Sequence, residues 1–299
     1  MAYQQLIECV PNFSEGRDQE VIEAIVDHFR GKKGVKLLDY SNDEDHNRMV
    51  VSLVGEPAAI KEAVLKAVGT ALDRIDMRNH QGQHPRMGAV DVIPLIPIKN
   101  ISVEETIELS REWAQEIYDL YQLPSFLYEK SASAPHREDL SKLRKGQFEG
   151  MAEKILDEAY RPDFGSEIHP TGGIVAVGCR MPLIAFNVNL DTPYFEVANK
   201  IAHNVRNLSG GLKYVKAIGI VLRDRGISQV SMNLTDYTKT PLYRAIELIR
   251  VEARRYGVTV VGSEIVGLVP MDALIHSAEY YMGLEDFCVD QVLEKRLME

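Results

Sequence analysis

The chain has 299 residues, of which 45% are hydrophobic and 26% are charged, and its formal net charge at pH 7 is -10. This length suits one large or two medium domains, and the composition is typical of a globular protein. The negative charge argues against nucleic acid as a partner, because nucleic-acid binders usually present a basic face. A local basic pocket can still bind a small anion within an acidic surface.

Cysteine usage and the N-terminal residues favour a reducing compartment. Cys9, Cys179 and Cys288 form no Cys-x-x-Cys pair, so the sequence predicts neither a disulfide framework nor a zinc knuckle. Glu8 interrupts the first apolar patch, which is not typical of a signal peptide. No run approaches the ~18 apolar residues that a membrane-spanning helix needs. We therefore expect a cytoplasmic protein with no membrane partner.

Short β-rich runs alternate with amphipathic helical patterns in the first half of the chain. In order, the sequence predicts a strand at 6–10, a turn at 12–16, a helix at 18–29, strands at 35–40 and 49–54, a helix at 57–75, a strand at 90–98, a helix begun by a capping box of Ser102 and Glu105, and an edge strand at 126–128. The charged, weakly periodic residues 130–162 are expected to be helical.

The second half repeats this order of elements. We expect strands at 174–178, 183–190, 214–221, 229–234 and 258–261, and helices at 193–208, 241–256 and 270–281. Strand, helix, strand, strand, helix, strand is the order of a ferredoxin-like sandwich. The sequence therefore predicts an α/β (α+β) protein of two similar ferredoxin-like, mixed-sheet subdomains, residues 1–178 and 179–299, with a ligand groove between them.

The segment from Asn79 to Asp91 carries the most chemistry. It contains two histidines, two glycines, Arg86 and an aspartate, and an apolar run begins at its end. Histidine, with an unperturbed pKa of about 6.5, both gives and takes a proton near neutral pH. Pro85 holds the residue before it extended, which aims the His84 side chain. His84 is therefore the candidate acid/base group, with a surface loop histidine as the alternative.

His80 stands four residues before His84, a spacing that binds metal when both histidines lie on one helix. Gly82 and Pro85 oppose a helix in this segment. We therefore predict no metal site here.

Two arginines are candidates for gripping a substrate carboxylate. Arg48 follows a polar loop and precedes a strand, and Arg86 lies in the histidine segment. The planar guanidinium matches carboxylate geometry. For Arg48, an ion pair with Asp43 or Asp45 is the alternative.

Other polar residues stand at the ends of predicted strands. Asp39 is placed to orient a histidine, or to make a structural hydrogen bond. The turn with Asn12 and Ser14 either offers backbone N–H groups to an anion or is a plain connection. The pairs Gly172–Gly173 and Gly210–Gly211 precede strands and permit close approach of a flat ligand.

No nucleotide-binding glycine motif and no Gly-x-Ser-x-Gly elbow is present in the sequence. The residues alone therefore support an α/β enzyme that applies histidine acid/base catalysis to a small carboxylated substrate.

Six segments resemble the formiminotransferase family, in order along nearly the whole chain: Glu8–Gly16, Asp76–Met77, His84–Ala89, Asp163–Gly165, Ile184–Leu190 and Val261–Pro270. The resemblance implies transfer of the formimino group from N-formimino-L-glutamate to N5 of tetrahydrofolate, as in histidine degradation. Tetrahydrofolate or its polyglutamates would be the co-substrate, in the groove between two subdomains of a homodimer. The chain resembles the stand-alone form, without a cyclodeaminase part.

The resemblance also implies roles for individual residues. His84 matches the catalytic histidine, and Arg48 stands where the family has an active-site arginine. An acidic residue that the family can carry is Ser41 here, which leaves Asp39 as the leading candidate for orienting His84. Folate contacts are expected from two segments, through Gly165, Ser166, Gly172 and Gly173 and through Gly210, Gly211, Lys213, Lys216 and Gly219.

Three alternatives stay open at this point. A formyl group differs from a formimino group by O for NH, so the same site suits formyl transfer between glutamate and folate. A non-catalytic folate-binding protein would keep the two glycine segments and need neither His84 nor Arg48. A metal-dependent formiminoglutamate hydrolase would instead use His80 and His84.

Overall fold

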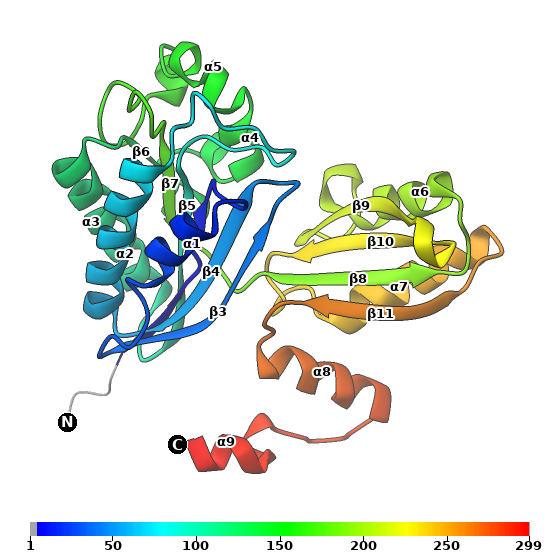
Figure 1. Ribbon diagram of the computed structural model, residues 1–299. Coiled ribbons are helices and arrows are strands. Elements are labelled where there is room, and N and C mark those ends of the chain that lie inside the picture. The colour runs from blue at the N-terminus through cyan, green and yellow to red at the C-terminus, as the bar shows by residue number, and fades with distance from the viewer. Residues whose placement is uncertain (1–4, 299) are drawn as a thin grey trace. The chain divides into compact units, whose positions relative to one another are not determined.

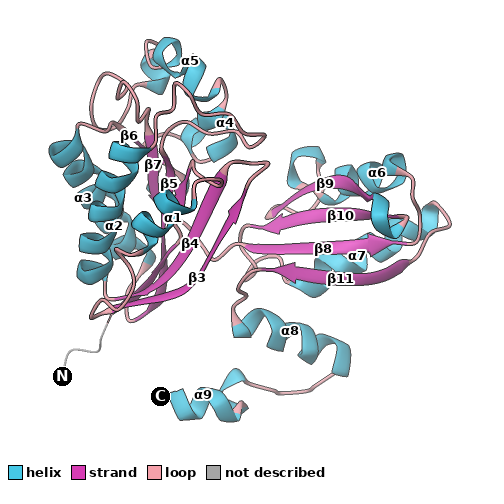
Figure 2. Cartoon of the chain, in the orientation of Figure 1, coloured by secondary structure: helices cyan, strands magenta, loops and turns pink. Residues whose placement is uncertain are grey.

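The structure, a computed structural model, describes residues 5–298 (Figure 1). The chain divides into two compact units, one ending at Arg180 and the other beginning at Met181. Each unit contains one β-sheet with helices (Figure 2), which confirms the predicted class of two similar α/β units. Within residues 5–298, every helix is too short or too polar to span a lipid bilayer.

The first unit contains the predicted ferredoxin-like order. Its elements are β1 (Leu6–Cys9), β2 (Asn12–Phe13), α1 (Gln19–Val26), β3 (Val35–Asp43), β4 (Arg48–Gly55), α2 (Pro57–Arg74) and β5 (Val90–Lys99). The strands run antiparallel in the order β5-β1-β4-β3. The turn predicted at 12–16 begins as β2, which continues β1 between the same two neighbours, β4 and β5.

The sheet of the first unit is extended beyond this core. The additional elements are α3 (Val103–Tyr121), β6 (Ser125–Leu127), α4 (Leu140–Arg144), α5 (Gln147–Lys154), β7 (Val175–Cys179) and the short 3-10 helices at Glu129–Ser131, Pro135–Arg137 and Glu158–Tyr160. β7 pairs in parallel with both β5 and β6, and β6 lies at the edge of the sheet as predicted. All five residues of β7 are buried, as expected for a parallel strand covered on both faces.

Helix starts follow the signals seen in the sequence. The Asp18 side chain accepts from the first backbone N–H groups of α1, and Pro57 begins α2. The capping box of Ser102 and Glu105 is present at the start of α3. The predicted helical content of residues 130–162 is confirmed as α4 and α5, which pack through Leu143 and Met151 on a separate apolar cluster.

The second unit is a four-stranded ferredoxin-like sheet. Its elements are β8 (Ile184–Leu190), α6 (Phe195–Val205), β9 (Val215–Leu222), β10 (Ile227–Leu234), α7 (Leu242–Arg255), β11 (Val260–Val266), α8 (Met271–Met282), α9 (Leu293–Met298) and the 3-10 helices at Asn207–Ser209, Arg223–Arg225 and Val289–Gln291. The antiparallel order is β11-β8-β10-β9. Alternate side chains of β8 enter an apolar core with α6 and α7.

The intervening side chains of this second sheet form a polar network. Gln229 donates to Asn189 Oδ1 at 2.9 Å and to Glu264 Oε1 at 2.8 Å, and Asn187 donates to the same Glu264 oxygen at 3.1 Å. Asn187, Asn189 and Gln229 are buried. These three strands therefore carry an ordered set of amide and carboxylate groups on one face.

Gly219 of β9 lies where α6 crosses the sheet. A Cβ atom at this position would stand 2.5 Å from the backbone nitrogen of Asn199, far inside contact distance. We predict that Gly219→Ala lowers the free energy of unfolding by about 1–3 kcal/mol through overpacking. Gly262→Ala, on β11, is the control, because its Cβ would meet only Asn189 Nδ2, at 3.8 Å. Equal urea midpoints for the two variants would contradict this account.

Candidate functional site

Asp91, the second residue of β5, is the buried centre of the candidate site. Its Oδ2 accepts hydrogen bonds from Arg48 Nη1 at 2.7 Å and from Arg144 Nη2 at 2.5 Å. Its Oδ1 accepts from the backbone N–H of Met87 at 2.9 Å. Burial would raise the pKa of Asp91, but the two guanidiniums outweigh burial and hold this pKa below its usual value. Asp91 is therefore charged and joins β4, β5 and α4.

Arg48 connects this carboxylate to His84. Its Nη1 lies 3.2 Å from His84 Nδ1, and its Nη2 donates to Asn12 Oδ1 at 2.7 Å. A guanidinium has donors only, so Nδ1 of His84 accepts. The ring proton of neutral His84 is therefore carried by Nε2.

The surroundings of His84 keep its imidazole neutral. Burial, then the charges of Arg48 and Arg144, lower the pKa of His84 to about 4, against opposing contributions from Asp91 and the Pro85 carbonyl. At pH 7 the site thus combines a neutral imidazole with two guanidiniums and one carboxylate.

Arg86 holds the segment that carries His84. Its Nε donates to His80 Nδ1 at 3.1 Å, and its Nη2 donates to the His80 carbonyl at 3.1 Å. Its remaining N–H groups donate to Gln147 and, in a two-pronged ion pair, to Glu149. His80 Nε2 lies 3.0 Å from the Asn47 carbonyl, which fixes the other side of its ring. The five donors of Arg86 are thus engaged within the protein, and its contact with substrate stays a prediction.

The first glycine segment lies beside the His84 segment. Ala89 donates to the Gly172 carbonyl at 2.9 Å, and a Cβ at Gly88 would stand 2.5 Å from the same oxygen. Gly173 has φ +72°, and a Cβ there would stand 2.2 Å from the Met87 carbonyl. Only glycine fits such a close approach of two backbones.

Asn12 and Ser14 also belong to this neighbourhood. Asn12 orients Arg48, as described above, and donates to the Val10 carbonyl at 2.6 Å. Ser14 is buried, with its Oγ donating to the Gly88 carbonyl at 2.8 Å. Both side chains therefore position other parts of the site.

Gly165 and Ser166 lie at the far end of the first glycine segment. Gly165 has φ +84° and packs against the Tyr118 ring and Pro124, where a Cβ would stand within 3 Å of both side chains. Ser166 is exposed. In the described chain, neither residue has a hydrogen bond to His84.

The second glycine segment belongs to the second unit. Gly210 has φ +91° with open space around it, and Gly211 lies against the carbonyls that end α6. Lys213 is exposed, with Nζ 5.4 Å from the centre of the Tyr214 ring, and Lys216 is exposed on β9. These side chains present positive charge on their own unit.

Asp39 is exposed on β3, opposite Ser52. Across residues 5–298, no hydrogen bond or ion pair joins Asp39 to His84; the carboxylate near His84 is Asp91. Sequence reasoning missed Asp91 and Arg144. A signal for Asp91 existed, because a lone aspartate inside an apolar strand requires a charged partner when buried.

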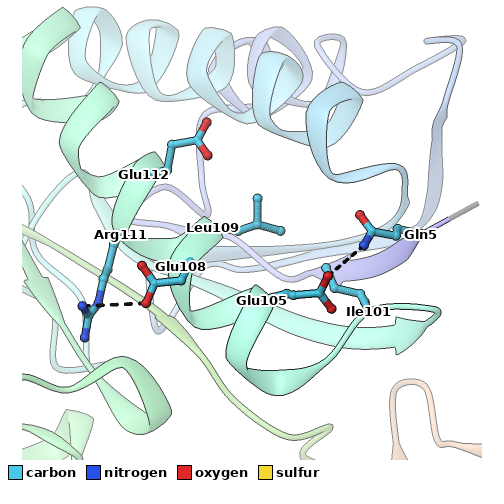
Figure 3. A pocket seen from close by; sticks show the side chains of 7 residues that line it. All are labelled: Gln5, Ile101, Glu105, Glu108, Leu109, Arg111 and Glu112. Carbon is cyan, nitrogen blue, oxygen red and sulfur yellow. Dashed lines mark hydrogen bonds and ion pairs between the residues drawn. The ribbon is translucent and has the colours of Figure 1, made fainter.

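A shallow hollow of about 520 Å³ lies on α3, apart from these residues (Figure 3). It is lined by Gln5, Ile101, Glu105, Glu108, Leu109, Arg111 and Glu112. Glu105 caps α3, and Glu112 pairs with Lys61 of α2. Its charged groups thus have structural partners. No cluster of three or more potential metal ligands occurs in the part of the chain described.

Comparison with known proteins bears on both units. The model of the formiminotransferase domain, N-terminal subdomain, matches residues 6–180, and that of the formiminotransferase domain matches residues 185–298. The chain belongs to the formiminotransferase family. A glutamate formimidoyltransferase of Streptococcus pyogenes serotype M1 is 53% identical to this formiminotransferase, over 98% of this chain and 99% of the relative.

Two further relatives of this formiminotransferase extend the comparison. A glutamate formimidoyltransferase of Thermoplasma acidophilum is 43% identical over 98% of this chain and 97% of its own length. A formimidoyltransferase-cyclodeaminase of Rattus norvegicus is 41% identical over 95% of this chain, which corresponds to 54% of that protein.

In this formiminotransferase, we predict that His84 stays neutral at pH 6, with its proton on Nε2. Long-range ¹H–¹⁵N NMR spectra, assigned with His84→Gln, would report the tautomer and the titration. Arg48→Gln removes a neighbouring positive charge and should raise the pKa of His84, whereas Arg161→Gln, at an exposed arginine, should not. A His84 ring that is mostly protonated at pH 6 in the wild type would contradict the assignment.

The same shift predicts a pH dependence of stability. The pKa of His84 is lower in the folded protein than its unfolded value of about 6.5, so the unfolded state takes up a proton first as the pH falls. The contribution of neutral His84 is therefore fully present above pH ~6.5 and is lost as the pH falls towards 4. Urea unfolding at several pH values should show this loss in the wild type and less of it in His84→Gln.

Proposed function

We propose that the chain transfers the formimino group from N-formimino-L-glutamate to N5 of tetrahydrofolate, giving 5-formiminotetrahydrofolate and L-glutamate. The observation that carries the proposal is the near full-length similarity to relatives named glutamate formimidoyltransferase. The site agrees with it, because His84 and two guanidiniums provide a proton carrier and positive charge for anionic substrates.

Tetrahydrofolate acts as a co-substrate in this proposal, and no metal takes part. The segments 165–173 and 210–219 contact the folate, and the exposed Lys213 and Lys216, with Arg206, meet its glutamyl tail. We also propose a homodimer in the cytoplasm. Sedimentation of the purified chain tests the homodimer, and activity measured with a chelator added tests whether a metal takes part.

The reaction needs one proton to move from N5 to the amine of glutamate. N5 attacks the formimino carbon, and the tetrahedral intermediate expels the amine only when that nitrogen is protonated. His84 takes the proton that N5 loses and passes it to the amine, a contribution of typically ~10²–10⁴-fold. Because Arg48 Nη1 lies against Nδ1 of His84, this contact must be exchanged before Nδ1 accepts a proton. Holding both substrates in register contributes comparably or more.

We predict that His84→Gln lowers turnover at least ~100-fold and leaves tetrahydrofolate binding nearly unchanged, since it removes the proton carrier and no folate contact. The assay follows glutamate release from N-formimino-L-glutamate, with and without tetrahydrofolate, together with the folate product. His203→Gln, at an exposed residue of α6, is the matched control.

Other outcomes separate the alternatives. Release without folate would show a hydrolase. Folate binding without release would show a binding protein. N-formyl-L-glutamate in the same assay tests formyl transfer, in which O replaces NH in the group that moves.

A further inference from the structure

The charges of the Asp91 cluster do not balance. Asp91 is fully buried, while the side chains of Arg48 and Arg144 are 12% and 15% exposed. One carboxylate thus faces two guanidiniums, and the adjacent His84 is neutral at pH 7. A surplus positive charge in a low-dielectric environment favours the binding of an anion.

Most N–H donors of the Arg144 side chain have no hydrogen-bond partner in the described residues. In the described residues its only hydrogen-bond partner is Asp91, through Nη2, and its buried Nε has none. Arg86, by contrast, uses all five of its N–H groups within the protein. Unsatisfied donors of a charged group cost free energy, which a ligand carboxylate would offset.

The helix that carries Arg144 is held in place. Asp139 caps the N-terminus of α4. At the other end, Lys154 Nζ donates to the carbonyls of Lys142, Leu143 and Lys145, at 2.6, 2.7 and 3.0 Å. The α4 backbone on both sides of Arg144 is therefore anchored, so its guanidinium is presented from a fixed position.

We propose that Arg144, together with Arg48, binds the α-carboxylate of the N-formimino amino acid beside His84, and that Arg144 makes the enzyme specific for donors that carry this group. This inference rests on the proposed function and deepens it. The choice of carboxylate follows from distance. His84 must reach the amine nitrogen, Arg48 lies 3.2 Å from His84, and the α-carboxylate is the acidic group nearest that nitrogen.

Binding of this carboxylate also prepares His84 for its role. The groups that face His84 are Arg48, Arg144, Asp91, the Pro85 carbonyl and the His46 ring. An anion on the two arginines offsets the charges that oppose protonation of the imidazole. Binding of the amino-acid substrate should therefore raise the pKa of His84, although burial, the largest cause of its shift, still holds this pKa down.

The test compares two donors, N-formimino-L-glutamate and N-formimino-4-aminobutyrate, which lacks the α-carboxylate. For the complete donor, Arg144→Gln should lower kcat/KM by ~10- to 150-fold, the value of a charge-assisted hydrogen bond. For the truncated donor it should change kcat/KM less than about threefold, and the KM for tetrahydrofolate should stay within about twofold. Lys145→Gln, an exposed neighbour on the same segment, is the control.

Two readouts guard against a variant that is merely misfolded. Arg144→Lys keeps the charge beside Asp91 and should keep the wild-type melting temperature while losing part of the discrimination. Independently of turnover, L-glutamate added to the wild type should raise the pKa of His84 in NMR spectra, and 4-aminobutyrate should not.

Either of two results would overturn the inference: an Arg144→Gln enzyme that still prefers the complete donor as strongly as the wild type, or a His84 titration that L-glutamate leaves unchanged. Failure of the proposed function looks different. It would appear as a wild type that releases no glutamate with tetrahydrofolate, while the L-glutamate titration would still report on Arg144.

Discussion

The ion pairs of buried Asp91 with Arg48 and Arg144 are the interaction on which the first unit's site depends. Burying a carboxylate costs several kcal/mol, and here two guanidiniums and the Met87 backbone N–H offset that cost. Removing Asp91 would leave two largely buried guanidiniums uncompensated, at a cost of about 3–5 kcal/mol. Since the members come from β4, β5 and α4, this requirement fixes the relative positions of three elements. It also fixes His84, whose ring nitrogen lies against Arg48.

The two units share one arrangement of elements but carry different polar groups on it. Both contain an antiparallel sheet in the order 4-1-3-2 of a split βαβ motif. In the first unit, β6 and β7 extend this sheet in parallel, and α4 and α5 add a separate apolar cluster that carries Arg144 to Asp91. The second unit has no such extension within its described residues, and its sheet instead displays the amide network around Gln229. His84, Arg48 and Asp91 thus belong to the motif, and the added segment supplies Arg144.

Sequence patterns predicted the elements well because each depends on local spacing. The Ser102 cap, the period of α1 and the β-α-β-β-α-β order are all properties of neighbouring residues. His84 and Arg48 were also found, through loop chemistry and family resemblance, and the structure places them in contact. The carboxylate beside His84 could not be predicted from local spacing. Its place at a strand end favours Asp39, whereas the structure places Asp91 beside His84. Arg144 lies 53 residues from Asp91, so its partner is set by tertiary packing of a segment that had shown only charge and weak periodicity.

Electrostatics explains how an acidic chain suits anionic substrates. The net charge of -10 describes the whole molecule, and at physiological ionic strength charges beyond about 8 Å are largely screened. Inside the site, low dielectric strengthens the nearby charges, so the surplus of one guanidinium favours an anion there. Burial, together with that surplus, lowers the pKa of His84 and makes it a weak base. In the proposed reaction, a histidine that gains basicity beside a bound carboxylate would accept a proton when the amino-acid substrate is in place, which would link the proton transfer to the presence of the amine that must receive the proton.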